Sequence, residues 1–330
     1  MQTSPLLERL GVELPIVQAG MGGGLSRSKL AAAVSEAGGL GTLGMLDPAA
    51  LAGDLDRTRE RTGRPVAVNL LLPFTRAEHW RVAERADVIV TYWGPPRRGS
   101  AGPWLHQCGS VDEARAAVEA GADGVIVQGV EAGGHVRGAI PALELLARAR
   151  RALPPGFPIL LAGGVADATD VEEALLAGAE AAVLGTRFLM STESAAHALY
   201  KERLVAGRST VLTDLFGAGW PAPHRVLRNR ATARWLGRDG QGPGWLRAAH
   251  RVTAPVLRRV PLSTQGRIAA LQRPALPLLS PTAPTTGSPD RLVEAAPLYA
   301  GETVGRMDRI EPAGTLVARL VGRVPESVRR

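Results

Sequence analysis

The residues of this sequence that could do chemistry are glycines and polar side chains that follow short apolar runs. They occur at 18–24, at Asn69, and at 128–135, 163–164 and 185–186. Because glycine has no Cβ, its backbone can approach a flat ring or a phosphate and donate N–H groups to it. One glycine pair would fit a tight turn equally well. Two such endings, at 163–164 and at 185–186 where Thr186 adds a hydroxyl, favour a phosphorylated ligand.

His135 is the strongest candidate for proton chemistry. It directly follows two glycines at the end of an apolar run, and histidine has an ordinary pKa near 6.5 that suits acid–base work at neutral pH. Its position alone leaves a surface loop histidine as the alternative. We predict no metal site, because His106 and His197 have no partner at metal-ligand spacing. We expect the remaining histidines at the surface: His79, His224 and His250.

Four other side chains have more than one interpretation. Cys108 lies within an apolar run and is expected to be a core residue rather than a nucleophile. Glu131 is either catalytic or has a helix-cap or loop role, and Met21 either packs against a cofactor ring or fills the core. Ser26 is expected to start a helix, since no G-x-S-x-G motif surrounds it.

Short apolar runs alternate with Ala-rich amphipathic stretches through the first 205 residues. Runs of strand length lie at 15–19, 39–43, 65–70, 87–92, 104–108, 124–128, 158–162 and 181–185, and helical patterns lie at 28–37, 49–62, 110–120, 140–153 and 168–177. Apolar strands that alternate with helices indicate a parallel sheet covered on its faces, and eight strands close a barrel. We therefore predict an α/β fold, a (β/α)8 TIM barrel, with its site at the carboxyl ends of the strands.

Two segments depart from a plain barrel. Only residues 93–103, rich in Gly, Pro and Arg, separate the fourth run from the fifth, so the fourth βα unit is shortened. Beyond 205 the periodicity is weakly helical to 260, and the Pro-rich stretch 271–290 is expected to be extended or mobile. We predict a barrel over 1–205, a helical, Pro-rich cap or substrate region over 206–299, and a closing barrel helix and tail over 300–330.

The composition argues against several classes of protein. The net charge is +8, but all but two of the basic residues are arginines spread along the whole chain, and aromatic residues make up only 4%. We therefore expect no nucleic-acid partner. With Cys108 as the only cysteine, no intrachain disulfide can form. No run approaches the ~18 apolar residues that span a bilayer, and the N-terminus has no signal-peptide pattern, so we expect no membrane partner and a cytoplasmic location.

The run endings resemble motifs of the nitronate monooxygenase family, formerly called 2-nitropropane dioxygenases. The segment 128–135, Gln-Gly-Val-Glu-Ala-Gly-Gly-His, is similar to the hallmark of the family. Other matches follow in the same order at 15–19, 37–41, 68–70, 161–164 and 184–188, and residues 297–301 look like its Tyr-Ala-Gly element. The resemblance covers 12–205 well and 293–322 fairly. The shorter motifs are shared with FMN-dependent enoyl-acyl-carrier-protein reductases.

The resemblance implies an FMN-binding barrel that oxidises alkyl nitronates with O2, giving carbonyl compounds and nitrite. His135 corresponds to the hallmark histidine that faces flavin and substrate, and Tyr299 corresponds to a substrate-side tyrosine. The partners implied are a small-molecule substrate and O2, with a homodimer as one expected assembly. The implied cofactor contacts are Met21, Asn69, Gln128, Gly133, Gly134, Gly163, Gly164, Val183, Leu184, Gly185 and Thr186.

The sequence also departs from the family pattern, and the departures leave the substrate open. Val183 stands where the family often has Gln, Gly301-Glu302-Thr303 stands where Gly-Gln is usual, and residues 235–290 match no family motif. Two alternatives therefore remain. One is an NAD(P)H-dependent FMN enoyl-thioester reductase, and the other is a diverged FMN-binding protein without catalytic activity.

Overall fold

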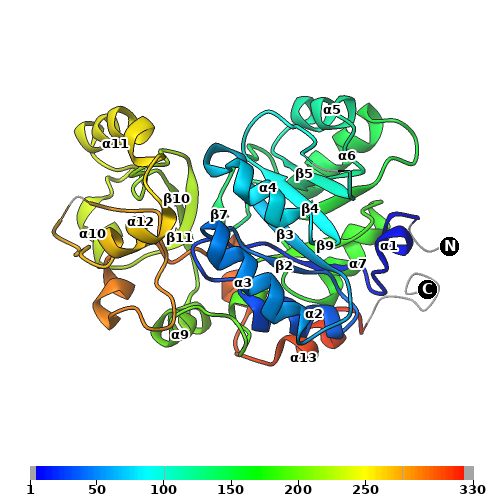
Figure 1. Cartoon of the computed structure of the whole chain (residues 1–330). Helices are drawn as coiled ribbons and strands as arrows, with labels where there is room; N and C mark the ends of the chain where they lie inside the picture. The colour runs from blue at the N-terminus through cyan, green and yellow to red at the C-terminus, as the bar shows by residue number, and fades with distance from the viewer. Residues whose placement is uncertain (1–4, 100, 277, 323–330) are drawn as a thin grey trace.

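Eight parallel strands form the barrel of this chain, whose computed structural model describes residues 5–99, 101–276 and 278–322 (Figure 1). They are β1 (Ile16–Gln18), β2 (Gly41–Leu43), β3 (Val66–Leu71), β4 (Val88–Tyr92), β5 (Trp104–Cys108), β6 (Gly124–Gln128), β8 (Ile159–Ala162) and β9 (Ala182–Leu184). Their order is β1-β9-β8-β6-β5-β4-β3-β2, and a parallel bridge from Val17 to Leu40 joins the two ends. The barrel predicted from the alternating pattern is confirmed.

Helices cover the outside of this barrel. They are α2 (Ser28–Glu36), α3 (Pro48–Arg59), α4 (Ala77–Ala83), α5 (Val111–Glu119), α6 (Ala142–Ala152), α7 (Ala168–Leu176) and α13 (Ala313–Leu320). The last of these packs on α2 and α7 and so completes the helical layer, as expected of a closing helix. No helix among the described residues is long and apolar enough to cross a bilayer.

Two apolar layers hold the barrel together. One fills its interior with side chains such as Val17, Ala67 and Leu105, and α1 (Pro5–Leu10) closes the N-terminal end of this layer with its leucines. The other lies between strands and helices and includes Cys108. Burial raises the pKa of the Cys108 thiol to about 12, so this side chain is a core residue, as predicted, and not a thiolate nucleophile.

The shortened fourth unit is confirmed: the described residues between β4 and β5, 93–99 and 101–103, contain no helix. Trp93, the first residue after β4, has φ 65°, which is unusual for a residue with a bulky side chain. The preceding unit does contain a helix, α4, which the sequence analysis did not predict. Only two of its seven residues are buried, and one of them is the polar His79, so its apolar periodicity is weak.

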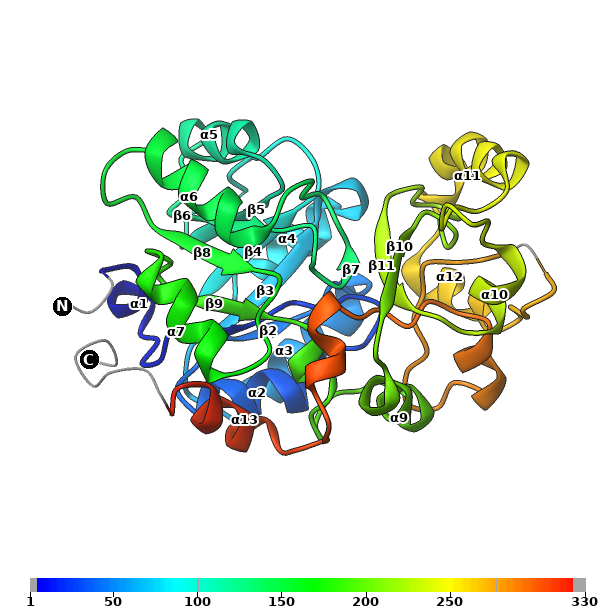
Figure 2. The ribbon, with the colours of Figure 1, turned by 180° about the vertical axis from the view of Figure 1, so that it is seen from behind.

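The segment beyond the barrel strands forms a second lobe beside the carboxyl ends of the strands (Figures 1 and 2). It contains α9 (Ala198–Ala206), α10 (Arg230–Trp235), α11 (Gly244–Leu257) and α12 (Leu262–Ala269), so helices are present as expected. Its two strands, β10 (Thr210–Thr213) and β11 (His224–Leu227), form an antiparallel sheet with β7 (Gly134–His135), which comes after β6, and this sheet was not predicted. These strands are two to four residues long and, unlike the short barrel strands, do not lie in continuous apolar runs, so the sequence gives no strand signal there.

Short helices complete the chain. They are the 3-10 helices η1 (Leu72–Phe74), η2 (Asp290–Glu294) and η3 (Glu302–Arg306), and α8 (Thr186–Leu189).

The pairing of β7 with β11 matters most for the site, because β7 follows the barrel strand β6 while β11 belongs to the cap. The carboxyl end of the barrel and the cap are thus joined by backbone hydrogen bonds.

Candidate active site

A cavity of about 890 Å³ lies at the carboxyl ends of the strands, between the barrel, α12 and the loop 281–289. This volume is near the upper end of the range of ligand-binding cavities. Every residue predicted as a site residue lines it: Met21, Asn69, Gln128, Gly133, Gly134, His135, Gly163, Gly164, Val183, Leu184, Gly185, Thr186 and Tyr299. The structure therefore brings the predicted residues together, while the role of each stays a prediction.

The glycines after β8 and β9 form a cradle of open backbone. Gly163 and Gly164 have φ of 104° and 78°, which favour glycine, and a Cβ built on Gly185 would have no neighbour nearer than 3.8 Å. Among the described residues, the backbone N–H groups of these three glycines donate to no backbone acceptor. The Thr186 hydroxyl accepts from the Gly301 N–H at 2.9 Å and keeps its own proton to donate. These groups fit a phosphate.

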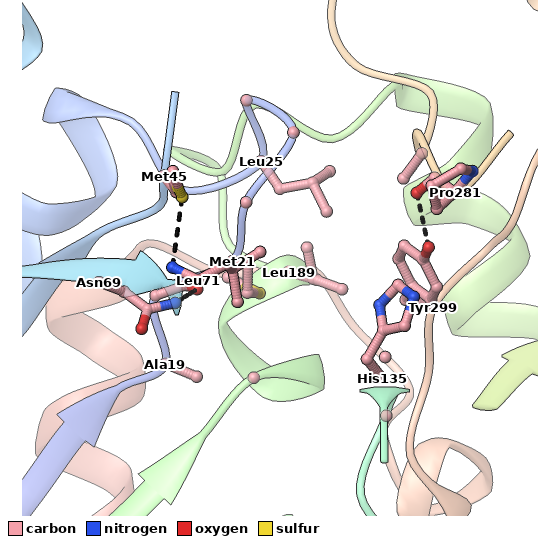
Figure 3. Close-up of a pocket in the computed structure, with 18 of the residues that line it drawn as sticks. Ala19, Met21, Leu25, Met45, Asn69, Leu71, His135, Leu189, Pro281 and Tyr299 are labelled. Carbon is pink, nitrogen blue, oxygen red and sulfur yellow. Dashed lines mark hydrogen bonds between the residues drawn. The ribbon is translucent and has the colours of Figure 1, made fainter. Parts of the chain in front are cut away.

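Asn69 offers a second unfilled contact on the same side of the cavity. Its Nδ2 donates to the Gly20 carbonyl at 2.8 Å, whereas its Oδ1 is buried and has no partner among the described residues. Figure 3 shows Asn69 near Ala19 and Met21. A ring N–H of a flavin would satisfy such an acceptor. Met21 packs against the core and also lines the cavity, so core filling is confirmed and its contact with a cofactor ring stays a prediction.

Two predicted cofactor contacts have their groups engaged within the protein. Gln128 Nε2 donates to the His135 carbonyl at 3.0 Å, and its Oε1 accepts from the Tyr92 hydroxyl at 2.6 Å and from the Arg137 N–H at 3.0 Å. Its side chain therefore fixes the loop that carries β7. A Cβ on Gly133 would lie 2.6 Å from the backbone at 300–301, so chain packing requires this glycine.

His135 lies on the opposite wall of the cavity, beside Tyr299 (Figure 3). Its backbone pairs with His224 of β11, its ring stacks on Trp220 with centroids 3.6 Å apart, and its Nε2 is buried without a partner among the described residues. Burial, with a smaller contribution from His224, lowers the pKa of His135 well below 6.5. The imidazole is neutral at pH 7 and is not a surface loop histidine.

Tyr299 supports this wall. Its hydroxyl donates to the Pro281 carbonyl at 2.6 Å, and its ring centroid lies 5.6 Å from that of His135. Tyr200 in turn donates to the Tyr299 carbonyl at 2.6 Å. Because burial raises the pKa of Tyr299 above its usual value, this side chain is a neutral phenol whose proton is already engaged. It can contact a substrate with its ring or accept a hydrogen bond, but it does not supply a free proton.

Glu131 and Ser26 have structural partners. Glu131 Oε1 accepts from the Ala142 N–H at 2.8 Å, at the first residue of α6, so the helix-cap interpretation holds. The Ser26 hydroxyl donates to the Thr42 carbonyl at 2.8 Å, and α2 begins two residues after it. The expectation that Ser26 starts this helix is therefore wrong by two residues.

The expectation of surface positions for His79, His224 and His250 is wrong, because all three are buried. His79 of α4 hydrogen-bonds the Leu46 carbonyl through Nε2, and His224 hydrogen-bonds the backbone at Ala222 and Phe216. His79 contacts Leu46 and His224 pairs with His135 of β7, both far away in the chain, so the local sequence gave no signal for these two positions. The described residues contain no group of three or more possible metal ligands.

Trp220 was missed by the sequence analysis although it lines the cavity and stacks on His135. It lies in a cap loop that carries no recognisable motif. Only the pairing of β7 with β11 brings it next to His135, and that pairing joins residues about ninety positions apart in the chain.

Comparisons with known proteins match this architecture over almost the whole chain. The family model described as nitronate monooxygenase matches residues 3–94 and 104–322. A carboxyl-CoA dehydrogenase of Mycobacterium tuberculosis is 28% identical, with 96% of this chain and 95% of that protein aligned. A nitronate monooxygenase of Pseudomonas aeruginosa is 32% identical over 62% of this chain and 74% of its own. The solved structure of FabK from Thermotoga maritima has a TM-score of 0.75 at 27% identity, covering 98% of this chain and 96% of that one. The unmatched stretch of the family model coincides with the shortened fourth unit.

Proposed function

The chain belongs to the nitronate monooxygenase family and is a flavin-dependent oxidoreductase, and from that premise we propose that it binds FMN and oxidises alkyl nitronates or nitroalkanes with O2 to carbonyl compounds and nitrite. One observation carries the proposal. The neutral imidazole of His135 shares one cavity with a glycine cradle and with Asn69, and both His135 Nε2 and Asn69 Oδ1 are buried atoms without a partner in the described part of the chain.

The residues that would hold FMN divide into two groups. The backbone at 163–164 and 185–186 would bind the phosphate, with the Thr186 hydroxyl as a further donor. Asn69 would accept a hydrogen bond from the ring, and the buried Val183 and Leu184 would pack near it. When bound there, FMN supplies the redox chemistry, accepting electrons from the substrate and passing them to O2.

His135 has two tasks in this proposal, depending on the form of the substrate. A nitronate is an anion, and Nε2 in its protonated tautomer would donate a hydrogen bond to a nitronate oxygen. A neutral nitroalkane must first lose its α-proton, and a neutral Nε2 is able to accept it. The lowered pKa keeps the imidazole neutral, and therefore able to act as a base, at and below neutral pH.

Oxygen uptake tests the proposed reaction. Protein loaded with FMN is mixed with propionate 3-nitronate or with a nitroalkane, and O2 consumption and nitrite release are followed together. We expect both signals with at least one substrate form. Protein that holds FMN but consumes no O2 and releases no nitrite with either form would contradict the proposal.

A second candidate is the oxidoreduction of a larger acyl thioester with NAD(P)H. The Mycobacterium tuberculosis protein, which aligns with 96% of this chain, is named as a carboxyl-CoA dehydrogenase. The cavity is also large for a small nitronate. Anaerobic mixing with NADH separates the two candidates. Bleaching of the flavin by NADH favours the thioester reaction, and an unchanged flavin spectrum favours nitronate oxidation.

A further inference from the structure

Aromatic side chains are scarce in this chain but gather at one wall of the cavity. They make up 4% of the residues, yet Trp220 contacts three rings at once. Its ring centroid lies 3.6 Å from that of His135, 5.1 Å from that of Trp93 and 5.4 Å from that of Phe74. The His135 contact is a parallel stack, whereas the Trp93 and Phe74 contacts are edge-to-face. Such packing fixes the orientation of the indole.

The Trp220 side chain is buried, but its polar atom is not satisfied. The residue is 6% exposed and lines the cavity, and its indole Nε1 is buried with no partner among the described residues. The stacked His135 has an unpartnered Nε2 on the same wall. Buried indole N–H groups almost always find an acceptor, because leaving one unpaired is unfavourable. Two unpaired nitrogens on stacked rings at a cavity wall therefore point to a ligand.

The shortened fourth unit supplies the residue that holds Trp220. Trp93 follows β4 directly, where most barrel units continue toward a helix, and its φ of 65° places it in the left-handed region. This conformation is unfavourable for a bulky residue and persists only where the surroundings enforce it. Here the Trp93 ring makes an edge-to-face contact with Trp220 and also packs against the Arg137 guanidinium, which lies 4.9 Å from its centroid. The strained backbone thus directs Trp93 against the cap residue.

We propose that Trp220 binds substrate: its indole N–H, beside Nε2 of His135, donates a hydrogen bond to an oxygen of the planar nitro or nitronate group. Trp93 is a positioning residue that acts through Trp220. The proposal rests on the proposed function for the identity of the group bound. An oriented N–H dipole in a buried site stabilises negative charge on oxygen without reorganisation, which suits a nitronate anion beside a neutral imidazole.

The direct test compares Trp220→Phe with Trp245→Phe, both in FMN-loaded protein. Phe keeps a stacked ring but has no N–H, and Trp245 is a matched control because it is 58% exposed on α11. Sodium nitrate, a planar oxyanion, is titrated while the flavin absorbance is recorded. We expect Trp220→Phe to weaken nitrate binding about 10- to 100-fold, as for loss of a hydrogen bond to a charged group, with KM for nitronate rising more than kcat falls. Unchanged nitrate binding in Trp220→Phe would overturn the proposal.

A second measurement does not depend on the folding of that variant. In wild-type protein labelled with 15N at the indole nitrogens, saturating nitrate should move one indole N–H signal downfield, and no movement of any signal would overturn the proposal. For Trp93, the variant Trp93→Leu should shift the same signal and weaken nitrate binding, and Trp93→Phe should restore both. Failure of Trp93→Phe to restore them would remove the positioning role. Protein that binds nitrate through Trp220 yet oxidises no nitronate would contradict the proposed function and leave this binding site standing.

Discussion

The imidazole of His135 is neutral because of its position in the folded chain, where burial lowers its pKa. A histidine after two glycines could be recognised in the sequence as a proton-transfer candidate, but its burial could not, because Trp220 and His224 reach it from the cap. Contacts with distant segments also help to bury His79 and His224. Residue types at strand ends therefore predicted the lining of the cavity, while the environment that sets each pKa became visible only in the structure.

Replacing His135 by Asn tests its role as a base. Asn can donate or accept a hydrogen bond but cannot take the α-proton, so kcat/KM for a neutral nitroalkane should fall by about 100-fold or more, and kcat/KM for the preformed nitronate should fall much less. Steady-state oxygen uptake with both substrate forms gives the comparison. Equal kcat/KM values for wild type and variant on both forms would remove His135 from the chemistry.

The pH dependence gives a second test at the residue scale. Because burial lowers the pKa of His135 well below 6.5, the imidazole remains neutral as the pH falls through 6.5. We expect kcat/KM for a nitroalkane to show no inflection near pH 6.5 and to decline only at lower pH. A profile of initial rates between about pH 5 and 8 checks this. A loss of activity centred near 6.5 would show an imidazole with an ordinary pKa.

At the scale of elements, the loops after β8 and β9 carry the proposed phosphate site. Gly164→Ala should weaken FMN binding, because the added Cβ would lie 3.2 Å from Glu131 Oε1 and the backbone φ is 78°. Gly156→Ala is a matched control, since its φ is 76° and a Cβ there would meet nothing within 4 Å. Both variants should lose about 1 kcal/mol of folding stability from backbone strain. Titration of the apoproteins with FMN should show a raised Kd for Gly164→Ala alone, and equal Kd values would argue against this cradle.

The elements themselves were predictable to different degrees. The eight barrel strands and six of the seven helices over them follow from apolar runs and periodicity, because the strands lie in apolar runs and the helices bury an apolar face. The short helix α4 and the sheet of β7, β10 and β11 did not follow. Their few residues are stabilised mainly by neighbours distant in the chain. The boundaries of the cap at 206–299 and of the closing segment at 300–330 stay predictions.

At the scale of the whole molecule, Asp47 connects the barrel to the cap. Its two carboxylate oxygens accept from the Leu262 and Ser263 N–H groups at 2.9 Å, at the start of α12. Burial raises its pKa, but these hydrogen bonds outweigh burial and lower the pKa below its ordinary value. The ionised Asp47 therefore caps a helix that lines the cavity, although the two lie more than two hundred residues apart.

Asp47→Ala should loosen the cap without unfolding the barrel. Loss of a helix cap of this kind destabilises by about 1 kcal/mol, so amide hydrogen exchange in α12 should become about five times faster, and FMN should leave the protein sooner. Asp56→Ala is the control, because the Asp56 carboxylate at the barrel surface pairs with Arg85 and with no other side chain that the structure describes. Unchanged exchange in α12 of Asp47→Ala would show that other contacts hold the cap.

The central claim is that the cavity at the carboxyl end of the barrel holds FMN with its phosphate at the glycines after β8 and β9. The most direct measurement is to denature the purified protein, or the apoprotein reconstituted with flavins, and to identify and count the released cofactor by chromatography. We predict FMN, close to one per chain, in wild type and in Gly156→Ala, with less retained by Gly164→Ala. A colourless protein that takes up no FMN, or one that releases only a flavin lacking the phosphate, would contradict the account.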